Sequence, residues 1–168
     1  MPSSLEQIYD VHAGALYAFL LNCTRNHALV QDVLQEVFLK LARTPSLLKK
    51  ARDPRSFLLR IAHNALLDLV RHSGTRAAYE EKHAGEASTL FLPEFPSDDE
   101  AFRSSVEAAL QDLPQEQRAV LHLKLWESLT FSQIAETLEI SQHTAASRYR
   151  YALDKLRDVL RPVYEERL

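Results

Sequence analysis

The sequence predicts an all-α protein of two small helical domains joined by a flexible acidic linker. Apolar residues make up 46% of the chain and recur at helical spacing, and three glycines leave long stretches without a turn signal. Charge is uneven. Residues 1–76 hold 10 Lys and Arg against 6 Asp and Glu, residues 77–100 hold 1 against 7, and residues 101–168 hold 9 against 10. The net charge of −3 therefore hides a basic first part and an acidic middle segment.

The acidic segment defines the predicted domain boundaries. Residues 74–99 contain two glycines, two prolines and six acidic residues, and no apolar period persists there apart from the short run "LFLPEF". This composition is typical of a linker. We therefore expect one domain at residues 1–73 and another at residues 100–168, each with a modest core of its own.

Three helices are predicted in the first domain. Ser3 and Glu6 have capping-box spacing at the start of the first helix, whose apolar residues recur at helical period, and Asn26 can cap the second. Asp53 followed by Pro54 predicts the start of a third helix that ends near His72. Their apolar positions are Leu5, Ile8, Tyr9, Leu16, Phe19 and Leu20, then Val30, Val33, Leu34, Val37, Phe38 and Leu41, then Phe57, Leu58, Ile61, Ala65, Leu66 and Leu69.

The second domain is predicted to end in a helix-turn-helix. Ser97 and Glu100 form a capping box for a fourth helix, and Pro114 separates that helix from a fifth. Thr130 and Gln133 form another capping box, and Ser141 can cap the last helix only three residues after the preceding helix ends. So short a turn forces a steep crossing of the two helices.

The last helix carries a candidate DNA-reading face. Gln142 and Arg150 can reach base edges in a major groove, while hydroxyl and guanidinium groups beside them can hold phosphates. An ordinary polar surface helix is the alternative interpretation. The candidate residues are Gln142, His143, Thr144, Ser147, Arg148, Arg150 and Tyr151.

Several other functions are disfavoured. Cys23 is the only cysteine, so the chain forms no internal disulfide and no Cys-based zinc site, and we expect Cys23 to be a small buried residue. The seven histidines share no metal-like spacing, and no catalytic constellation is visible. The start of the chain is unlike a signal peptide, and no apolar run is long enough for a membrane span. We expect a cytoplasmic protein that is not an enzyme and needs no cofactor or metal.

Both predicted domains resemble one family in order and spacing. The segment "LPQEQRAVLHLKLWESLTFSQIAETLEISQHTAASRYRYALDKLR" is similar to region four of bacterial sigma factors of the extracytoplasmic-function class. The segments "IYDVHAGALYAFLLNCT", "LQEVFLKLAR" and "DPRSFLLRIAHNALLDLVR" resemble region two of the same class. A helix-turn-helix alone would be weak evidence, whereas two ordered domains with a linker between them are a strong signal.

The resemblance implies binding to core RNA polymerase and to promoter DNA, with an anti-sigma factor or another regulator as a further partner. Region four would read the −35 element. Asp32, Gln35 and Glu36 would face a coiled coil of the largest polymerase subunit, and the acidic linker would enter a basic polymerase channel. The segment from Arg43 to Arg60, with six cations and one acid, would capture the −10 element during melting. The residues implied there are Lys49, Lys50, Arg52, Arg55, Phe57, Arg60 and Asn64.

The sequence departs from the family pattern at several positions. Glu139 stands where a turn glycine is common, Phe57 replaces a frequent tryptophan, and Ala146 replaces a frequent basic residue. A family cluster of acids is reduced to Asp32, because Leu29, Val30 and Gln31 occupy the other positions.

The reduced acid cluster leaves two explanations open. Leu29 and Val30 would supply apolar contact with polymerase instead, or phosphorylation of a hydroxyl such as Thr24 would supply charge. Two other functions also stay open. One is a free-standing helix-turn-helix regulator, and the other is a helical adaptor that binds only proteins.

Overall fold

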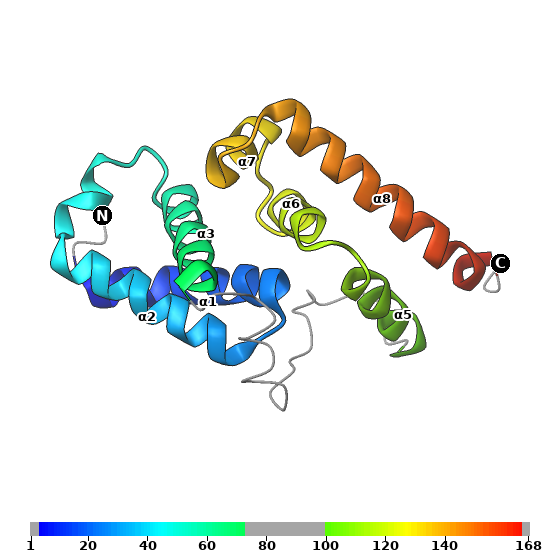
Figure 1. The fold of residues 1–168 in the computed structure, drawn as a ribbon, viewed down its shortest axis with the longest axis horizontal. Coiled ribbons are helices and arrows are strands. Elements are labelled where there is room, and N and C mark those ends of the chain that lie inside the picture. The colour runs from blue at the N-terminus through cyan, green and yellow to red at the C-terminus, as the bar shows by residue number, and fades with distance from the viewer. Residues whose placement is uncertain (1–3, 73–99, 166–168) are drawn as a thin grey trace. The chain divides into compact units, whose positions relative to one another are not determined.

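The computed structural model describes residues 4–72 and 100–165, and its elements within these ranges are α-helices and one 3₁₀ helix (Figure 1). The predicted all-α class is confirmed for this part of the chain. The described residues fall into two compact units, one before residue 73 and one after residue 99. The predicted linker, its "LFLPEF" run, Ser3 and Ser97 lie outside the described residues. No helix of the described part has the length and apolar character to cross a membrane.

The N-terminal unit is built from three helices that all pack on one another: α1 (Leu5–Thr24), α2 (His27–Arg43) and α3 (Pro54–His72). In Figure 1, α3 crosses the paired α1 and α2. Apolar side chains at helical spacing on each helix close a dry core between them. Its most deeply buried members include Leu16, Phe19, Leu20, Val30, Val33, Leu58, Leu59 and Leu66, and Cys23 is buried as expected.

Side-chain caps begin each of these three helices. The Ser4 hydroxyl accepts from the Gln7 amide at 3.2 Å, so α1 starts one residue later than the predicted Ser3 cap implies. Asn26 Oδ1 accepts from the Leu29 amide at 3.1 Å, which confirms the predicted cap of α2. The Asp53 carboxylate accepts from the Arg55 amide at 3.2 Å and from the Ser56 hydroxyl at 2.7 Å. These bonds satisfy helix-end donors that otherwise need water.

A short 3₁₀ helix, η1 (Pro45–Lys50), joins α2 to α3 and was not predicted from the sequence. Pro45 cannot continue α2, because it lacks an amide hydrogen, but its fixed φ suits a new helical start. The Leu47 amide then bonds to the Thr44 carbonyl at 3.2 Å, and the Ala51 amide bonds to the Leu48 carbonyl at 3.3 Å. This helix packs against α2 and carries Lys49 and Lys50 in its last turn.

The C-terminal unit consists of α5 (Glu100–Gln111), α6 (Gln115–Leu125), α7 (Phe131–Leu138) and α8 (Gln142–Glu165). The long α8 packs against the other three helices (Figure 1). A cluster between α5, α6 and α8 contains Val106, Leu110, Leu113, Leu121 and Ala152, with Phe102, Trp126, Tyr149, Leu153 and Leu156 at its edge.

The buried Arg118 side chain stabilises the turn between α5 and α6. It is 6% exposed, and its Nη1 donates to the Gln111 carbonyl at 3.2 Å and to the Leu113 carbonyl at 3.0 Å. A buried guanidinium is stable only with such partners, and it satisfies carbonyls at the end of α5 in return.

The predicted helix-turn-helix is present in α7 and α8. Thr130 and Gln133 form both halves of their capping box, with N···O distances of 2.8 and 3.1 Å. Glu139 ends α7 in the left-handed conformation with φ of 57°, so the turn accepts a side chain where glycine is common. The Ser141 hydroxyl accepts from the Thr144 amide at 3.0 Å and begins α8 as predicted.

Candidate nucleic-acid and protein interfaces

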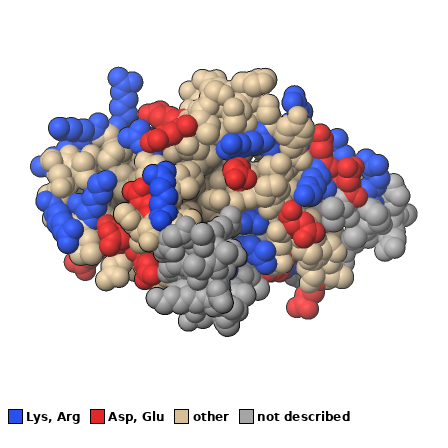
Figure 2. All heavy atoms as spheres, viewed as in Figure 1, with Lys and Arg blue, Asp and Glu red and all other residues tan. Residues whose placement is uncertain are grey.

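The N-terminal unit gathers its cations around η1. Lys49, Lys50 and Arg52 are exposed, and Arg55 and Arg60 at the start of α3 are half-buried. Figure 2 shows Lys and Arg side chains clustered at the end of this unit where η1 lies. Six of the seven charged residues between positions 43 and 60 are cationic, so this surface attracts a polyanion.

The one acid of this segment is committed to the helix start. Hydrogen bonds from Ser56, then from the Ser56 and Arg55 amides, hold the pKa of Asp53 below its usual value despite its partial desolvation. Its charge therefore serves to cap α3 and to orient Ser56. The Arg60 guanidinium lies 5.5 Å from the centre of the Phe57 ring. Two residues of the set implied for the −10 element therefore contact each other.

His12 on α1 belongs to the same neighbourhood, although nothing in the sequence pattern indicated it. Burial lowers the pKa of His12, the Arg55 guanidinium lowers it further, and the Asp53 carboxylate opposes both. The imidazole is thus kept neutral beside a basic surface. Only the packing of α1 on α3 brings these residues together, so a signal in local sequence was not to be expected.

A cleft of about 500 Å³ runs between α2 and α3. It joins two predicted sets, because Glu36 of the polymerase-binding set and Asn64 of the −10 set both line it. Lys40 also lines the cleft and had not been singled out from the sequence. The complete lining consists of Glu36, Val37, Lys40, Arg43, Thr44, Ile61, Asn64, Ala65, Asp68, Leu69 and His72.

The outer face of α2 presents all three predicted polymerase-binding residues. Asp32, Gln35 and Glu36 are exposed. The expectation that Leu29 and Val30 contact polymerase is wrong, because they are 5% and 0% exposed and belong to the core of their own unit. Their place at the first turns of α2, directly after the α1–α2 turn, points them at α1 and α3 instead of at solvent.

The first turns of α8 form the second predicted surface. Gln142, His143, Arg150 and Tyr151 are exposed, with Tyr151 57% exposed. Thr144, Ser147 and Arg148 are half-buried beside them. The Ser141 hydroxyl also donates to the Thr144 hydroxyl at 2.9 Å, so Thr144 is part of the cap as well as of the predicted phosphate-binding set. All seven predicted residues therefore reach the surface, at different depths.

A chain of ring contacts fixes the direction of α8. Phe131 of α7 meets Tyr149 of α8 edge-on at 5.6 Å, and Lys124 of α6 lies 4.4 Å above the Phe131 ring. Arg150 lies 5.6 Å from the Tyr151 ring. Contacts of this kind have preferred geometries, so they help to orient α8 against α6 and α7. Sequence spacing did not predict the role of Lys124, since its contact crosses between two helices.

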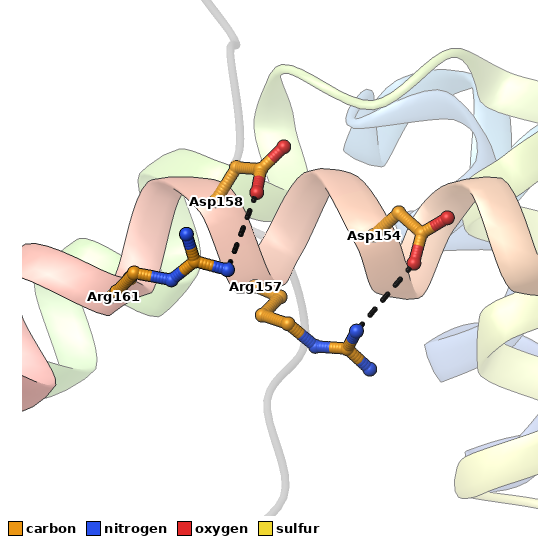
Figure 3. A network of polar contacts seen from close by, with 4 residues as sticks. All are labelled: Asp154, Arg157, Asp158 and Arg161. Carbon is orange, nitrogen blue, oxygen red and sulfur yellow. Dashed lines mark ion pairs between the residues drawn. The ribbon is translucent and has the colours of Figure 1, made fainter.

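The surface of α8 changes character after residue 153. Asp154 pairs with Arg157 at 3.8 Å, and Asp158 pairs with Arg161 at 3.9 Å (Figure 3). Both pairs are exposed and add little stability, but they balance the cations of this stretch with acids. In this later stretch Arg157 and Arg161 are thus each paired with an acid.

Among the described residues, no group of three or more His, Cys, Asp or Glu side chains is placed to hold a metal ion.

Comparison with known families matches both units. The "Sigma-70 region 2" model matches residues 8–76, and the "Sigma-70, region 4" model matches residues 109–158. The chain is 30% identical over 158 residues to ECF RNA polymerase sigma factor SigL of Mycobacterium tuberculosis, covering 91% of this chain and 86% of that protein. It is 29% identical over 157 residues to RNA polymerase sigma factor CarQ of Myxococcus xanthus, covering 94% and 89%.

Among solved structures, the fold is similar to the sigma factor RpoE from Bartonella quintana, which was crystallised with the anti-sigma factor NepR. The TM-score is 0.72 at 19% sequence identity, covering 93% of this chain and 96% of that chain.

Proposed function

The chain belongs to the extracytoplasmic-function class of RNA polymerase sigma factors, and on that premise we propose that it works through the two surfaces described above. It binds core RNA polymerase and directs promoter-specific initiation of transcription. The observation that carries the residue assignment is the position of both basic surfaces. Each lies inside a segment matched by the sigma-70 models, at η1 and α3 in region two and at the start of α8 in region four.

In this proposal the two surfaces do different work. The first turns of α8 enter the major groove of the −35 element, where Gln142 and Arg150 reach base edges. The cations around η1 hold the phosphates of the separating −10 strand, and Asn64 reads a base taken out of the stack. Asp32, Gln35 and Glu36 on α2 contact the polymerase. None of these roles requires a catalytic site in the chain.

The proposal explains how an acidic protein can serve at promoters. Polymerase supplies most of the non-specific attraction for DNA, which is the salt-dependent part of binding, and this chain adds readout at two short elements. The domains at residues 1–73 and 100–168 each act as a unit, and the acidic residues 74–99 enter a basic channel of the enzyme. Such an excess of acid would weaken a regulator that binds DNA alone.

Control by a partner protein is the remaining part of the proposal. The structural relative from Bartonella quintana is held by an anti-sigma factor, and we expect a protein regulator of that kind for this chain. Both units are helical and carry exposed surfaces, which such a regulator can cover directly.

Run-off transcription with purified core polymerase is the decisive experiment. The template is the region upstream of the gene that encodes this chain, and core polymerase without the chain is the control. We expect a discrete transcript only when both proteins are present. A gel-shift assay without polymerase separates the alternative, because a free-standing regulator binds the duplex alone and gives no run-off product.

A further inference from the structure

A line of core-facing side chains on α1 contains one histidine. Ile8, Leu16 and Leu20 are 9%, 1% and 0% exposed, and His12 stands between Ile8 and Leu16 at the same four-residue spacing. His12 itself is half-buried, on a helix that packs against α3. Such a position alone is typical of a structural histidine, so any further role must come from the groups that His12 faces.

The start of α3 faces His12 with one cation and one anion. Burial lowers the pKa of His12 most, the Arg55 guanidinium lowers it further, and the Asp53 carboxylate raises it. Among the described residues, the charges that shift this pKa both belong to α3, and α1, α2 and η1 supply none of them. The imidazole of the DNA-free chain is therefore neutral near neutral pH.

The two charges beside His12 differ in what a bound strand does to them. Asp53 is held in the cap of α3, where it accepts from the Arg55 amide at 3.2 Å and from the Ser56 hydroxyl at 2.7 Å. Arg55 belongs to the basic surface around η1. A phosphate bound at this surface offsets the charge of Arg55 and brings a negative charge towards His12, and both changes favour the imidazolium.

We propose that His12 is a proton-linked part of the strand-binding surface, so that capture of a DNA single strand around η1 is accompanied by protonation of the imidazole. This inference rests on the proposed function. The proton comes from solvent and binds the unprotonated ring nitrogen. The ligand is the phosphate backbone of the strand, because the effect needs a negative charge near Arg55 and no particular base.

The direction of the pH dependence follows from reciprocity. A strand that favours the protonated chain must itself be bound more tightly by the protonated chain. The pKa of His12 is then higher in the complex than in the free chain, where it lies below 6.5. The gain in affinity is fully present below the free-chain pKa and is lost as the pH rises through the pKa of the complex.

Fluorescence anisotropy of the assembled complex tests the proposal. The full chain is bound to core polymerase, and the probe is the gene's own upstream region as a duplex with a preformed bubble at the −10 element. Affinity is measured between about pH 8 and about pH 6. The test variant is His12→Gln, which cannot titrate. The matched control is His27→Gln, since His27 is an exposed histidine of the same unit whose ring contacts Tyr17.

We expect wild-type binding to strengthen about threefold more than that of His12→Gln as the pH falls, since a full unit of pKa difference is worth up to tenfold. His27→Gln should follow the wild type. Arg55→Gln should bind more weakly and show a smaller pH dependence, because the charge that the phosphate offsets is absent. Thermal melting verifies that each variant is folded.

A second measurement keeps the proposal testable if His12→Gln fails to fold. Calorimetry of the wild-type complex with the same probe, in two buffers of different ionisation enthalpy, gives the number of protons taken up on binding. We expect proton uptake that increases from about pH 8 to about pH 6.5 and is smaller for Arg55→Gln. No uptake, or equal uptake by Arg55→Gln, contradicts the proposal.

Three results of the anisotropy experiment overturn the inference: parallel pH curves for wild type and His12→Gln, an equal loss of pH dependence in His27→Gln, or wild-type binding that weakens relative to His12→Gln as the pH falls. If the wild type adds no binding beyond that of core polymerase alone, the proposed function fails. If the wild type binds the template and the curves are parallel, only this inference fails.

Discussion

The two candidate DNA surfaces differ in how they are built. Around η1 in the N-terminal unit, cations are many and exposed, and several can contribute to holding one strand. At the start of α8, charged residues are few, and caps, a tight turn and ring contacts fix the helix that carries them. The first surface relies on the amount of charge, and the second relies on the position of individual side chains.

This difference predicts how each surface responds to substitution. Where many cations bind one polyanion, the loss of a single cation lowers the affinity only slightly. Its main effect is on the salt dependence of binding. Where two side chains read base edges, loss of either removes a specific contact that no neighbour replaces. Substitutions in the two units should therefore have different signatures even when both reduce transcription.

The largest effect is expected at the start of α8. Arg150→Ala and Gln142→Ala should each cost about 1–3 kcal/mol of binding at the upstream promoter element, because each removes a base contact. Footprinting of the polymerase complex gives the measurement, and affinity for core polymerase should stay unchanged. If upstream protection survives both substitutions together, the reading face has been assigned to the wrong side of α8.

The second effect concerns the stability of the fold at acidic pH, which should differ between the two units. His122 on α6 is 1% exposed and stacks on Trp126 at 5.4 Å, and its burial lowers the pKa from 6.5 to about 3. Below pH 6.5 the unfolded chain binds a proton that the folded chain does not. Folding stability is therefore lost as the pH falls through this window, by roughly 1.4 kcal/mol per pH unit and about 2 kcal/mol by pH 5.

His122→Phe should reduce this pH dependence while keeping an aromatic ring beside Trp126. Amide hydrogen exchange on the full chain gives the free energy of opening for each helix between pH 7 and pH 5. We expect the slope to change in α6 and its neighbours and to stay the same in α1–α3. Equal slopes for wild type and variant would show that another group controls acid unfolding of this unit.

The third effect is collective. The triple variant Lys49→Ala, Lys50→Ala and Arg52→Ala should lower the slope of log affinity against log salt by about 2 for the opened promoter, since each single-strand phosphate contact contributes roughly 0.7. The affinity advantage of the wild type over the variant should therefore shrink about twentyfold when the salt concentration rises fourfold. The matched control neutralises Arg71, Arg157 and Arg161, which are exposed but each paired with an aspartate. An equal change in the control would mean that net charge alone matters.

The sequence predicted local features well and long-range features poorly. Caps at Asn26, Asp53, Thr130 and Ser141 were predictable because donor and acceptor lie within a few residues of each other. The apolar period of α2 also predicted its buried side. The burial of Arg118 was not predictable, since its partners lie across a turn whose path only the fold defines.

The candidate sites follow the same division. Exposure of Gln142 and Arg150 follows from helical spacing, and the structure shows it. Leu29 and Val30 were misassigned because family position was read as surface position, although their apolar character already favoured the core. Conversely, Tyr9 has the spacing of a core residue but is 54% exposed, with its ring against Phe38 of α2. Spacing defines a helix face, and only packing decides how much of that face is buried.

The smallest effect is expected on stability, at a type of helix-ending turn that occurs once in each unit. Arg25 ends α1 and Glu139 ends α7, and both adopt the left-handed conformation, with φ of 58° and 57°. The Arg25 amide donates to the Leu21 carbonyl at 2.7 Å, and the Glu139 amide donates to the Ala135 carbonyl. Glycine adopts this conformation without the strain that a Cβ adds. Glu139→Gly should therefore stabilise the C-terminal unit by about 0.5–1 kcal/mol.

Arg25→Gly should gain less than Glu139→Gly, and this difference tests how the two turns are held. The Glu139 side chain is exposed, whereas Arg25 is half-buried, so its replacement also removes packing. Hydrogen exchange resolves the gain in each unit, and Glu139→Asn, which tolerates the left-handed conformation, keeps a polar side chain as control. An equal gain in both units would mean that Arg25 contributes no packing. A loss at Glu139 would mean that its side chain stabilises the turn by more than the strain it imposes, and that the position of α8 depends on it.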